Sequence, residues 1–287
     1  AAIRDDCGAT SGTGAAKMLA FASGLRACMP SFMPPQISEI SEPAALRVAR
    51  GIKRVAVRTP LPGFEQPVGI SLADFQPEDG TSERTPTVVL IHGFDSSLFE
   101  FRRLAPCLPQ MRVVLVDLLG WGFTEKPDGV SYDVEAKRQC LAAVLDEILE
   151  ADEQVFLGGA SLGGAAAIDF ASVYSERVRA LILISPQAYL EGSPGEKLMW
   201  PLDRLGVSVL KSKPLRRLAN TQSYFDTDQF ATEEAMLIGR LPCLTDGWFG
   251  SNLKFMKSSG YRVKSTVAQL QQDALILWGR QDKILSA

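Results

Sequence analysis

The stretch that decides the fold is Gly159-Ala160-Ser161-Leu162-Gly163, which follows the apolar run Val155–Leu157 and opens a helical pattern that extends to Tyr174. A serine in a G-x-S-x-G pattern between a strand and a helix sits on a sharp, strained turn. Such a turn has no room for a bulky side chain two residues before or after the serine, and Gly159 and Gly163 meet this condition. Ser161 is therefore the candidate nucleophile.

The same stretch also contains a degenerate dinucleotide-binding fingerprint, Gly158-x-Ala160-x-x-Gly163. It lacks the middle glycine that lets the backbone approach a pyrophosphate. The next apolar run is followed by Ser185 rather than by an acid that could bind a ribose. Dinucleotide binding is therefore a minor alternative, and the main interpretation requires no cofactor and no metal.

Short continuous apolar runs surround this stretch and predict parallel strands that are buried on both faces. Helical patterns separate them, which is typical of a doubly wound α/β sheet. Lys53–Arg58 and Val68–Leu72 alternate apolar and polar residues and predict an antiparallel pair at the start of the sheet. The other expected strands are Val88–Ile91, Val113–Val116, Val155–Leu157, Leu181–Ile184 and Ala274–Leu277, and the expected helices are roughly Ser97–Cys107, Val134–Glu150 and Leu162–Tyr174.

The alternation of strand and helix lapses between Pro186 and about Gly260, where helical segments rich in large apolar residues replace it. An insertion of this length after a parallel strand is typical of a cap over the strand ends. We divide the chain into an N-terminal segment that is disordered or derived from a targeting sequence (1–43), the first part of the α/β core (44–186), a helical cap (187–260) and the second part of the core (261–287).

The loop His92-Gly93-Phe94-Asp95 directly follows the expected strand Val88–Ile91. In a site built around a serine of the G-x-S-x-G pattern, one oxyanion donor comes from the loop after that strand and the other from the residue after the nucleophile. We expect the N–H groups of Phe94 and Leu162 to be these donors. His92 is the chain's single histidine, but it precedes the serine, so we assign His92 and Gly93 to shaping the turn and not to proton transfer.

An acid follows the last apolar run, in Trp278-Gly279-Arg280-Gln281-Asp282. A carboxylate on the loop after that strand can orient a catalytic histidine and stabilise its charged form. Asp282 is the candidate acid, because it comes after Ser161 in the chain order that such sites use.

Composition and charge limit the partners. The chain has 287 residues, 46% of them apolar, a net charge of −3 and a sequence pI near 5.4. Such a chain offers no basic surface for nucleic acid, and its apolar runs are too short for a transmembrane segment. The five cysteines are widely spaced and odd in number, which favours a reducing, intracellular compartment over a disulfide framework.

With these motifs in order, the chain resembles the α/β-hydrolase superfamily of the fold-1 type, and more closely a plant and algal plastid-type group. The resemblance runs from about Ala44 to the end and implies a chloroplast location. It is carried by LIHGFDSS (90–97), VDLLGWGFT (116–124), Lys137-Arg138, VLKSKPL (209–215), IGRLPC (238–243) and LILWGRQD (275–282).

By this resemblance, a helix, a last strand, a loop with the catalytic histidine and a final helix are expected after Asp282. The chain ends at Ala287, so we expect a fragment that lacks the last strand and helix. Without them, Ala274–Leu277 would be an edge strand with an uncovered apolar face.

The main hypothesis is a serine hydrolase that cleaves a hydrophobic small-molecule ester through an acyl-enzyme on Ser161, with a thioester or an activated C–C bond as the less favoured scissile bonds. The alternative is a ligand-binding receptor or an inactive hydrolase-fold protein with little turnover. The oligomeric state is undetermined. Most large apolar residues of the cap are expected to pack against the core, and some to line an apolar pocket: Leu198, Met199, Trp200, Leu205, Trp248, Phe249, Phe255 and Met256.

Overall fold

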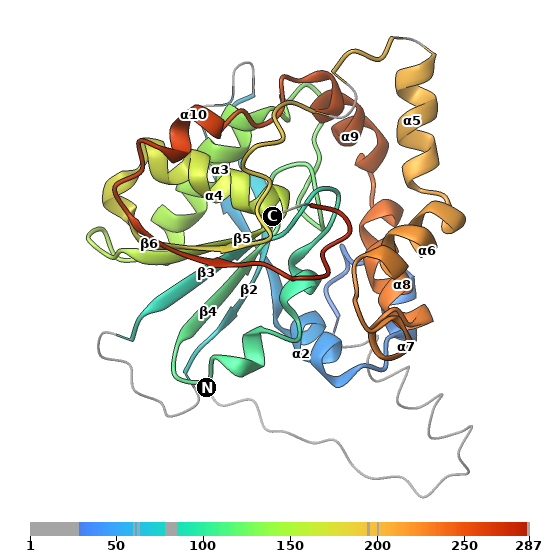
Figure 1. Ribbon diagram of the computed structural model, residues 1–287, viewed down its shortest axis with the longest axis horizontal. Helices are drawn as coiled ribbons and strands as arrows, with labels where there is room; N and C mark the ends of the chain where they lie inside the picture. The colour runs from blue at the N-terminus through green and yellow to red at the C-terminus, as the bar shows by residue number, and fades with distance from the viewer. Residues whose placement is uncertain are drawn as a thin grey trace, which may run out of the picture.

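The computed structural model describes residues 29–59, 61, 64–77, 85–193, 196–199 and 201–285. Within these residues a single sheet contains β1 (Ile52–Val57), β2 (Val68–Phe75), β3 (Thr87–Ile91), β4 (Arg112–Val116), β5 (Val155–Ala160), β6 (Val178–Ile184) and β7 (Asp273–Leu277). Their order across the sheet is β1-β2-β4-β3-β5-β6-β7 (Figure 1). Strand β2 is antiparallel to β1 and β4, and the strands from β4 to β7 are parallel. The expected mostly parallel sheet with an antiparallel start is confirmed.

Helices cover both faces of the sheet, and alternate side chains of each strand point to opposite layers. Helices α3 (Val134–Ile148) and α4 (Leu162–Val173) pack on one face, in the cluster that contains Val89 and Ile91. Helix α2 (Pro43–Gly51) and the 3₁₀ turn η2 (Leu98–Phe101) pack on the other face, in the cluster that contains Val88 and Leu90. This two-sided burial explains why the parallel strands read as continuous apolar runs.

A helical insertion joins β6 to β7. Figure 1 shows its helices grouped beside the sheet, apart from α3 and α4. None of the helices in the described part of the chain has both the length and the apolar composition of a membrane span. The insertion contains α5 (Leu202–Leu210), α6 (Lys213–Gln222), α7 (Thr227–Phe230), α8 (Glu233–Arg240), the 3₁₀ turn η5 (Leu241–Leu244) and α9 (Trp248–Lys257), and the short helix α10 (Lys264–Val267) follows before β7.

The structure differs from the sequence-based expectation after β3. The segment expected to be one helix, Ser97–Cys107, forms two 3₁₀ turns, η2 and η3 (Ala105–Cys107). Pro106 has no N–H to donate to a carbonyl four residues earlier, and it disfavours α-helical backbone at the residue before it. The apolar periodicity of the segment is real, but the proline prevents a continuous helix.

Residues before position 44 also pack on the core. The 3₁₀ turn η1 (Pro35–Glu39) precedes α2, and Ile37 and Ile40 are buried in the core on the α2 face. The carboxylate of Glu42 forms ion pairs with Arg102 and Arg103. Residues 29–43 therefore pack as part of the domain, while residues 1–28 of the expected N-terminal segment lie outside the described residues.

At the other side of the sheet, β7 is an edge strand that pairs only with β6 among the described strands. Leu275, Ile276 and Leu277 are 55%, 59% and 45% exposed, respectively. The edge position and the uncovered apolar face agree with the expectation for Ala274–Leu277.

Candidate active site

The strand register brings four loops to one edge of the sheet. Ile91 at the end of β3 pairs with Gly159, Ala160 at the end of β5 pairs with Ile184, and Ile184 pairs with Leu277. The carboxyl ends of these parallel strands therefore lie side by side. The loops that follow them carry Phe94, Ser161, Ser185 and Asp282, which are far apart in the sequence.

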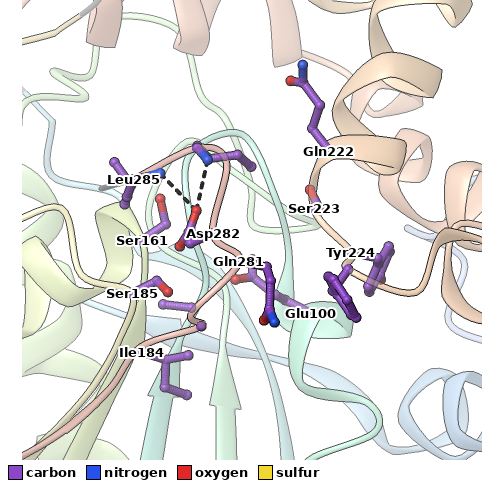
Figure 2. A pocket seen from close by; sticks show the side chains of 14 residues that line it. Glu100, Ser161, Ile184, Ser185, Gln222, Ser223, Tyr224, Gln281, Asp282 and Leu285 are labelled. Atoms are coloured by element: carbon purple, nitrogen blue, oxygen red, sulfur yellow. Dashed lines mark hydrogen bonds between the residues drawn. The ribbon is translucent and has the colours of Figure 1, made fainter. Parts of the chain in front are cut away.

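Two adjoining cavities open at this edge, and both are lined by Ser161 and Glu100. The first has a volume of about 280 Å³ and includes Ser185 and Asp282. The second has a volume of about 440 Å³ and includes Phe94 and Arg216. Figure 2 shows Ser161, Ser185 and Asp282 on one wall of the first cavity, with Gln222, Ser223 and Tyr224 of the helical insertion on the opposite side.

Ser161 occupies a strained turn between β5 and α4. Its backbone has φ 51° and ψ −120°, a conformation that costs energy for any residue with a Cβ. A Cβ on Gly159 would lie 2.1 Å from the carbonyl oxygen of Gly163, and a Cβ on Gly163 would lie 2.1 Å from the carbonyl oxygen of Ile91. The glycines on either side of the serine are therefore required by close backbone contact, which is the reason that the sequence pattern suggested.

Two backbone N–H groups were expected to donate to an oxyanion: that of Leu162, directly after Ser161, and that of Phe94, in the loop after β3. Leu162 is the first residue of α4, so its N–H has no partner within the helix and points from the positive end of the helix dipole. Neither this N–H nor that of Phe94 donates a hydrogen bond in the described part of the chain. Of these two residues, Phe94 lines the second cavity, whereas Leu162 is buried and lines neither cavity.

Asp95 ties the loop of Phe94 to the helical insertion. It has φ 48° and is buried. Its Oδ1 accepts hydrogen bonds from Trp248 Nε1 at 2.7 Å and from Asn252 Nδ2 at 3.2 Å, and its Oδ2 pairs with Arg216. Burial raises the pKa of Asp95, and these donors oppose the rise. Helices α6 and α9 therefore hold the loop in place.

Asp282 lies in the loop after β7. Its Oδ1 accepts the N–H groups of Ile284 at 2.8 Å and Leu285 at 2.9 Å (Figure 2). Burial raises its pKa, but the bonds from Leu285, Ile284 and the Ser185 hydroxyl outweigh that effect, so the pKa of Asp282 is lowered. At neutral pH Asp282 is a carboxylate that faces the cavity of Ser161.

His92 is fully buried behind the loop, and both of its ring nitrogens are engaged. Nδ1 lies 2.7 Å from the carbonyl oxygen of Gly93, and Nε2 accepts the N–H of Leu118 at 3.2 Å. This pattern corresponds to a neutral ring with its proton on Nδ1. Burial, the largest effect, lowers the pKa of His92 to about 4. His92 lines neither cavity, so it is not placed to exchange a proton with Ser161.

Some of the large apolar residues named in the sequence analysis were expected to line a pocket, and this expectation is wrong for those that the structure describes. Trp248, Phe255 and Met256 are buried in the core, Met199 and Leu205 are largely exposed, and Trp200 lies outside the described residues. None of those that the structure describes lines either cavity. The insertion instead contributes mixed polar and apolar residues to the cavities: Arg216, Ala219, Asn220, Gln222, Ser223, Tyr224, Phe225, Ala235, Met236, Ile238 and Gly239.

Three cavity or loop residues escaped the sequence analysis: Asp95, Glu100 and Ser185. Asp95 belongs to the quoted His-Gly-Phe-Asp motif, but nothing local connects it to Trp248, 153 residues later. Glu100 lies in the segment that was expected to be a regular helix. Ser185 has φ 39°, which follows from its position at the sharp end of β6. Asp95 and Ser185 are positioned by long-range contacts, with Trp248 and Leu277 respectively, whereas the hydrogen bond between Glu100 and Gly93 is local.

The backbone geometry argues against the alternative interpretation of a dinucleotide-binding site. Ala160, the middle position of the degenerate fingerprint, is paired with Ile184 within the sheet. A Cβ on Gly158 would lie 2.5 Å from the side chain of Leu90, so this glycine permits close packing between strands. Among the described residues, no group of three or more His, Cys, Asp and Glu is arranged to hold a metal ion.

Comparisons with known proteins agree with this architecture. A family model described as alpha/beta hydrolase fold matches residues 86–287. The chain is 34% identical over 260 residues to the alpha/beta hydrolase domain-containing protein VTE7 of Arabidopsis thaliana, covering 90% of this chain and 77% of that protein. It is 29% identical over 211 residues to 2-hydroxy-6-oxo-2,4-heptadienoate hydrolase of Pseudomonas putida, covering 69% and 72% of the two chains.

A solved structure shares the fold. The crystal structure of a probable hydrolytic enzyme from Pseudomonas aeruginosa PAO1 superposes with a TM-score of 0.64 at 19% identity, over 82% of this chain and 75% of that chain. At this level of identity the similarity concerns the fold alone.

Proposed function

Because the chain belongs to the alpha/beta hydrolase fold family, we propose that it is a serine hydrolase that cleaves a small-molecule ester through an acyl-enzyme on Ser161. The observation that carries this proposal is the position of Ser161. It sits on a strained turn with φ 51° and lines both cavities, beside two backbone N–H groups that have no partner in the described part of the chain.

In the proposed reaction, Ser161 Oγ attacks the ester carbonyl carbon as its proton passes to a base. The N–H groups of Phe94 and Leu162 donate to the carbonyl oxygen as it becomes an oxyanion. The base returns the proton to the departing alcohol, and an acyl group remains on Ser161. Water then attacks the acyl carbon by the same route, releases the acid and restores the serine.

The base in this proposal is a histidine that Asp282 orients through its carboxylate. The 287 residues contain one histidine, and His92 is buried with both nitrogens engaged. The proposal therefore assigns the base to a histidine from outside these residues. Asp282 is suited to its role, because its lowered pKa keeps it charged next to an imidazolium.

We assign the helical insertion the role of a cap that bounds the substrate site. Residues of α6 and α8 line the second cavity with Ser161, which supports this assignment. Because the lining combines apolar side chains with Arg216, Asn220 and Tyr224, we propose a substrate of mixed polarity. This replaces the hydrophobic ester that the insertion's composition suggested.

A second candidate is a ligand-binding protein on the same fold, which binds at Ser161 with little turnover. The observation that favours it is the burial of the single histidine, since a serine hydroxyl without a base is a poor nucleophile. A receptor would bind small molecules in the same cavities, so occupancy alone does not separate the two candidates.

The separating experiment applies a serine-directed fluorophosphonate to the full-length protein and maps the adduct by peptide mass spectrometry. A hydrolase is labelled at Ser161 and turns over p-nitrophenyl butyrate steadily. A receptor shows neither steady turnover nor rapid labelling.

We also propose the chloroplast location that the resemblance to plant proteins implies, and a fluorescent fusion of the full-length protein in plant cells tests it.

A further inference from the structure

Glu100 places a carboxylate next to the proposed nucleophile. Its Oε2 accepts the N–H of Gly93 at 2.9 Å, and the Ser96 hydroxyl also hydrogen-bonds to it. A Cβ built on Gly93 would be 3.4 Å from Ser161 Cβ and 3.6 Å from Glu100 Oε2. The nucleophile and the carboxylate therefore border the same small space. Glu100 is exposed to solvent and lines both cavities.

The positive charges around the second cavity are already paired with other carboxylates. Arg102 forms an ion pair with Glu42 at 3.0 Å, and Arg216 pairs with Asp95. Of the ion pairs that the described residues form, none includes Glu100, although Arg102 attracts it from a greater distance. Among the described residues that line the two cavities, the carboxylates outside any ion pair are those of Glu100 and Asp282.

The hydrogen bonds of Glu100 leave acceptor capacity toward the cavity. An ionised carboxylate has about four lone-pair positions, and the described donors to Glu100 are one N–H and one hydroxyl. Burial raises the pKa of Glu100, and the bonds from Gly93 and Ser96 oppose the rise. As a carboxylate, the group can accept a further hydrogen bond from a bound molecule.

We propose that Glu100 forms a charge-selective subsite beside Ser161. It favours esters that are uncharged, or that carry a hydroxyl or ammonium group, next to the scissile carbonyl, and it rejects esters that carry a carboxylate there. This inference rests on the proposed function, because it takes the cavity at Ser161 as the ester site. Repulsion between two like charges in a partly solvated cavity is enough to change affinity by about 10-fold or more.

The test measures binding and not turnover, so it does not depend on the catalytic base. The Ser161→Ala variant of the full-length protein is titrated in mildly alkaline buffer with p-nitrophenyl butyrate and with p-nitrophenyl hemisuccinate. These esters differ in that a carboxylate replaces the terminal methyl group of the acyl chain. A second pair, phenyl acetate and 4-carboxyphenyl acetate, places the charge on the alcohol side.

We expect the Ser161→Ala protein to bind the neutral member of at least one pair about 10-fold more tightly. Adding Glu100→Gln should remove that preference, and adding Glu100→Asp, which keeps the charge, should retain most of it. The matched control is Glu147→Gln, which removes an exposed carboxylate of α3 that lines neither cavity, and it should leave the preference unchanged.

Equal binding of the charged and neutral members of both pairs by the parent protein overturns the proposal, even if no Glu100 variant folds. A preference that survives Glu100→Gln in a folded protein also overturns it. The proposed function fails separately, if the wild-type full-length protein and Ser161→Ala hydrolyse p-nitrophenyl butyrate at the same rate.

Discussion

The carboxylate of Asp95 accepts a hydrogen bond of 2.7 Å from the indole N–H of Trp248, which joins the loop after β3 to the first turn of α9. Asn252, one turn later on the same helix, donates to the same oxygen at 3.2 Å. Arg216 pairs with the other oxygen of Asp95. The loop that carries the proposed oxyanion donor Phe94 is thus positioned by the helical insertion.

Asp95→Ala should therefore destabilise the fold and reduce turnover together. Removing the buried carboxylate leaves the partly buried Arg216 without its carboxylate partner and frees the donors of Trp248 and Asn252, which costs up to ~3–5 kcal/mol, the range for breaking a buried ion pair. Denaturant unfolding of the full-length protein measures this loss. Asp152→Ala, at an exposed turn, is the control and should stay within about 0.5 kcal/mol of wild type. A stable Asp95→Ala variant with full esterase activity would show that the contacts of Asp95 with the helical insertion are dispensable.

Ser161→Ala should remove ester hydrolysis by several orders of magnitude in the full-length protein and leave the fold intact. Without the nucleophile, only the oxyanion donors and substrate binding can contribute to the rate. Turnover of p-nitrophenyl butyrate and the thermal midpoint are measured side by side. Retention of a tenth or more of the wild-type rate contradicts the assignment of Ser161.

Gly163→Ala should destabilise the protein by at least ~2 kcal/mol, since the new methyl group would lie 2.1 Å from the carbonyl oxygen of Ile91 and force the backbones apart. Gly250→Ala is the matched control. This glycine lies in α9 with no atom within 4 Å of the added methyl group, so alanine should be neutral or stabilising by up to about 1 kcal/mol. Similar thermal midpoints for the two variants would mean that the turn at Ser161 tolerates a side chain.

His92→Asn should change how stability depends on pH. The folded-state pKa of His92 is about 4, below the unfolded value of 6.5, so unfolding takes up a proton between these values. The contribution of His92 to stability is therefore full above pH 6.5 and falls as the pH drops toward 4, by roughly 3 kcal/mol in total.

Denaturant unfolding at several pH values, taken as wild type minus His92→Asn, isolates this contribution from other groups. Burial raises the pKa of Asp117 to about 7, so the contribution of Asp117 to stability increases as the pH falls. In the wild type alone, this increase partly masks the loss that His92 causes. Esterase activity should fall only modestly in His92→Asn, through the loop it supports. A loss as large as that of Ser161→Ala, at unchanged stability, would identify His92 as the base.

Residues 1–287 by themselves should hydrolyse esters very slowly, because the only histidine is buried with both ring nitrogens engaged, and a serine hydroxyl without a base is a poor nucleophile. The exposed apolar residues of β7 should also make this chain prone to aggregation. The comparison uses a longer version that continues past residue 287 and measures turnover per folded molecule and the thermal midpoint. Equal turnover in the two would show that a group within the 287 residues serves as the base.

The sequence alone predicted the features that depend on local backbone geometry and burial. The glycines around Ser161 appear there because the turn brings backbone atoms within about 2 Å of any added Cβ, and the apolar runs of β3 to β6 appear because both faces of those strands are covered. The expected helix at Ser97–Cys107 was wrong, since apolar periodicity does not report the break that Pro106 imposes.

The amino-acid sequence by itself was enough to locate the strands of the sheet and the turn that carries Ser161. Each of these depends on steric and burial requirements within a few residues. Only the tertiary structure decided that Asp95 would meet Trp248, that Glu100 would border the space beside Ser161, and that Trp248 and Phe255 would be core residues rather than cavity lining. The physical reason is that such contacts join segments up to 153 residues apart. They follow from the relative positions of the packed layers, which no local pattern of residues specifies.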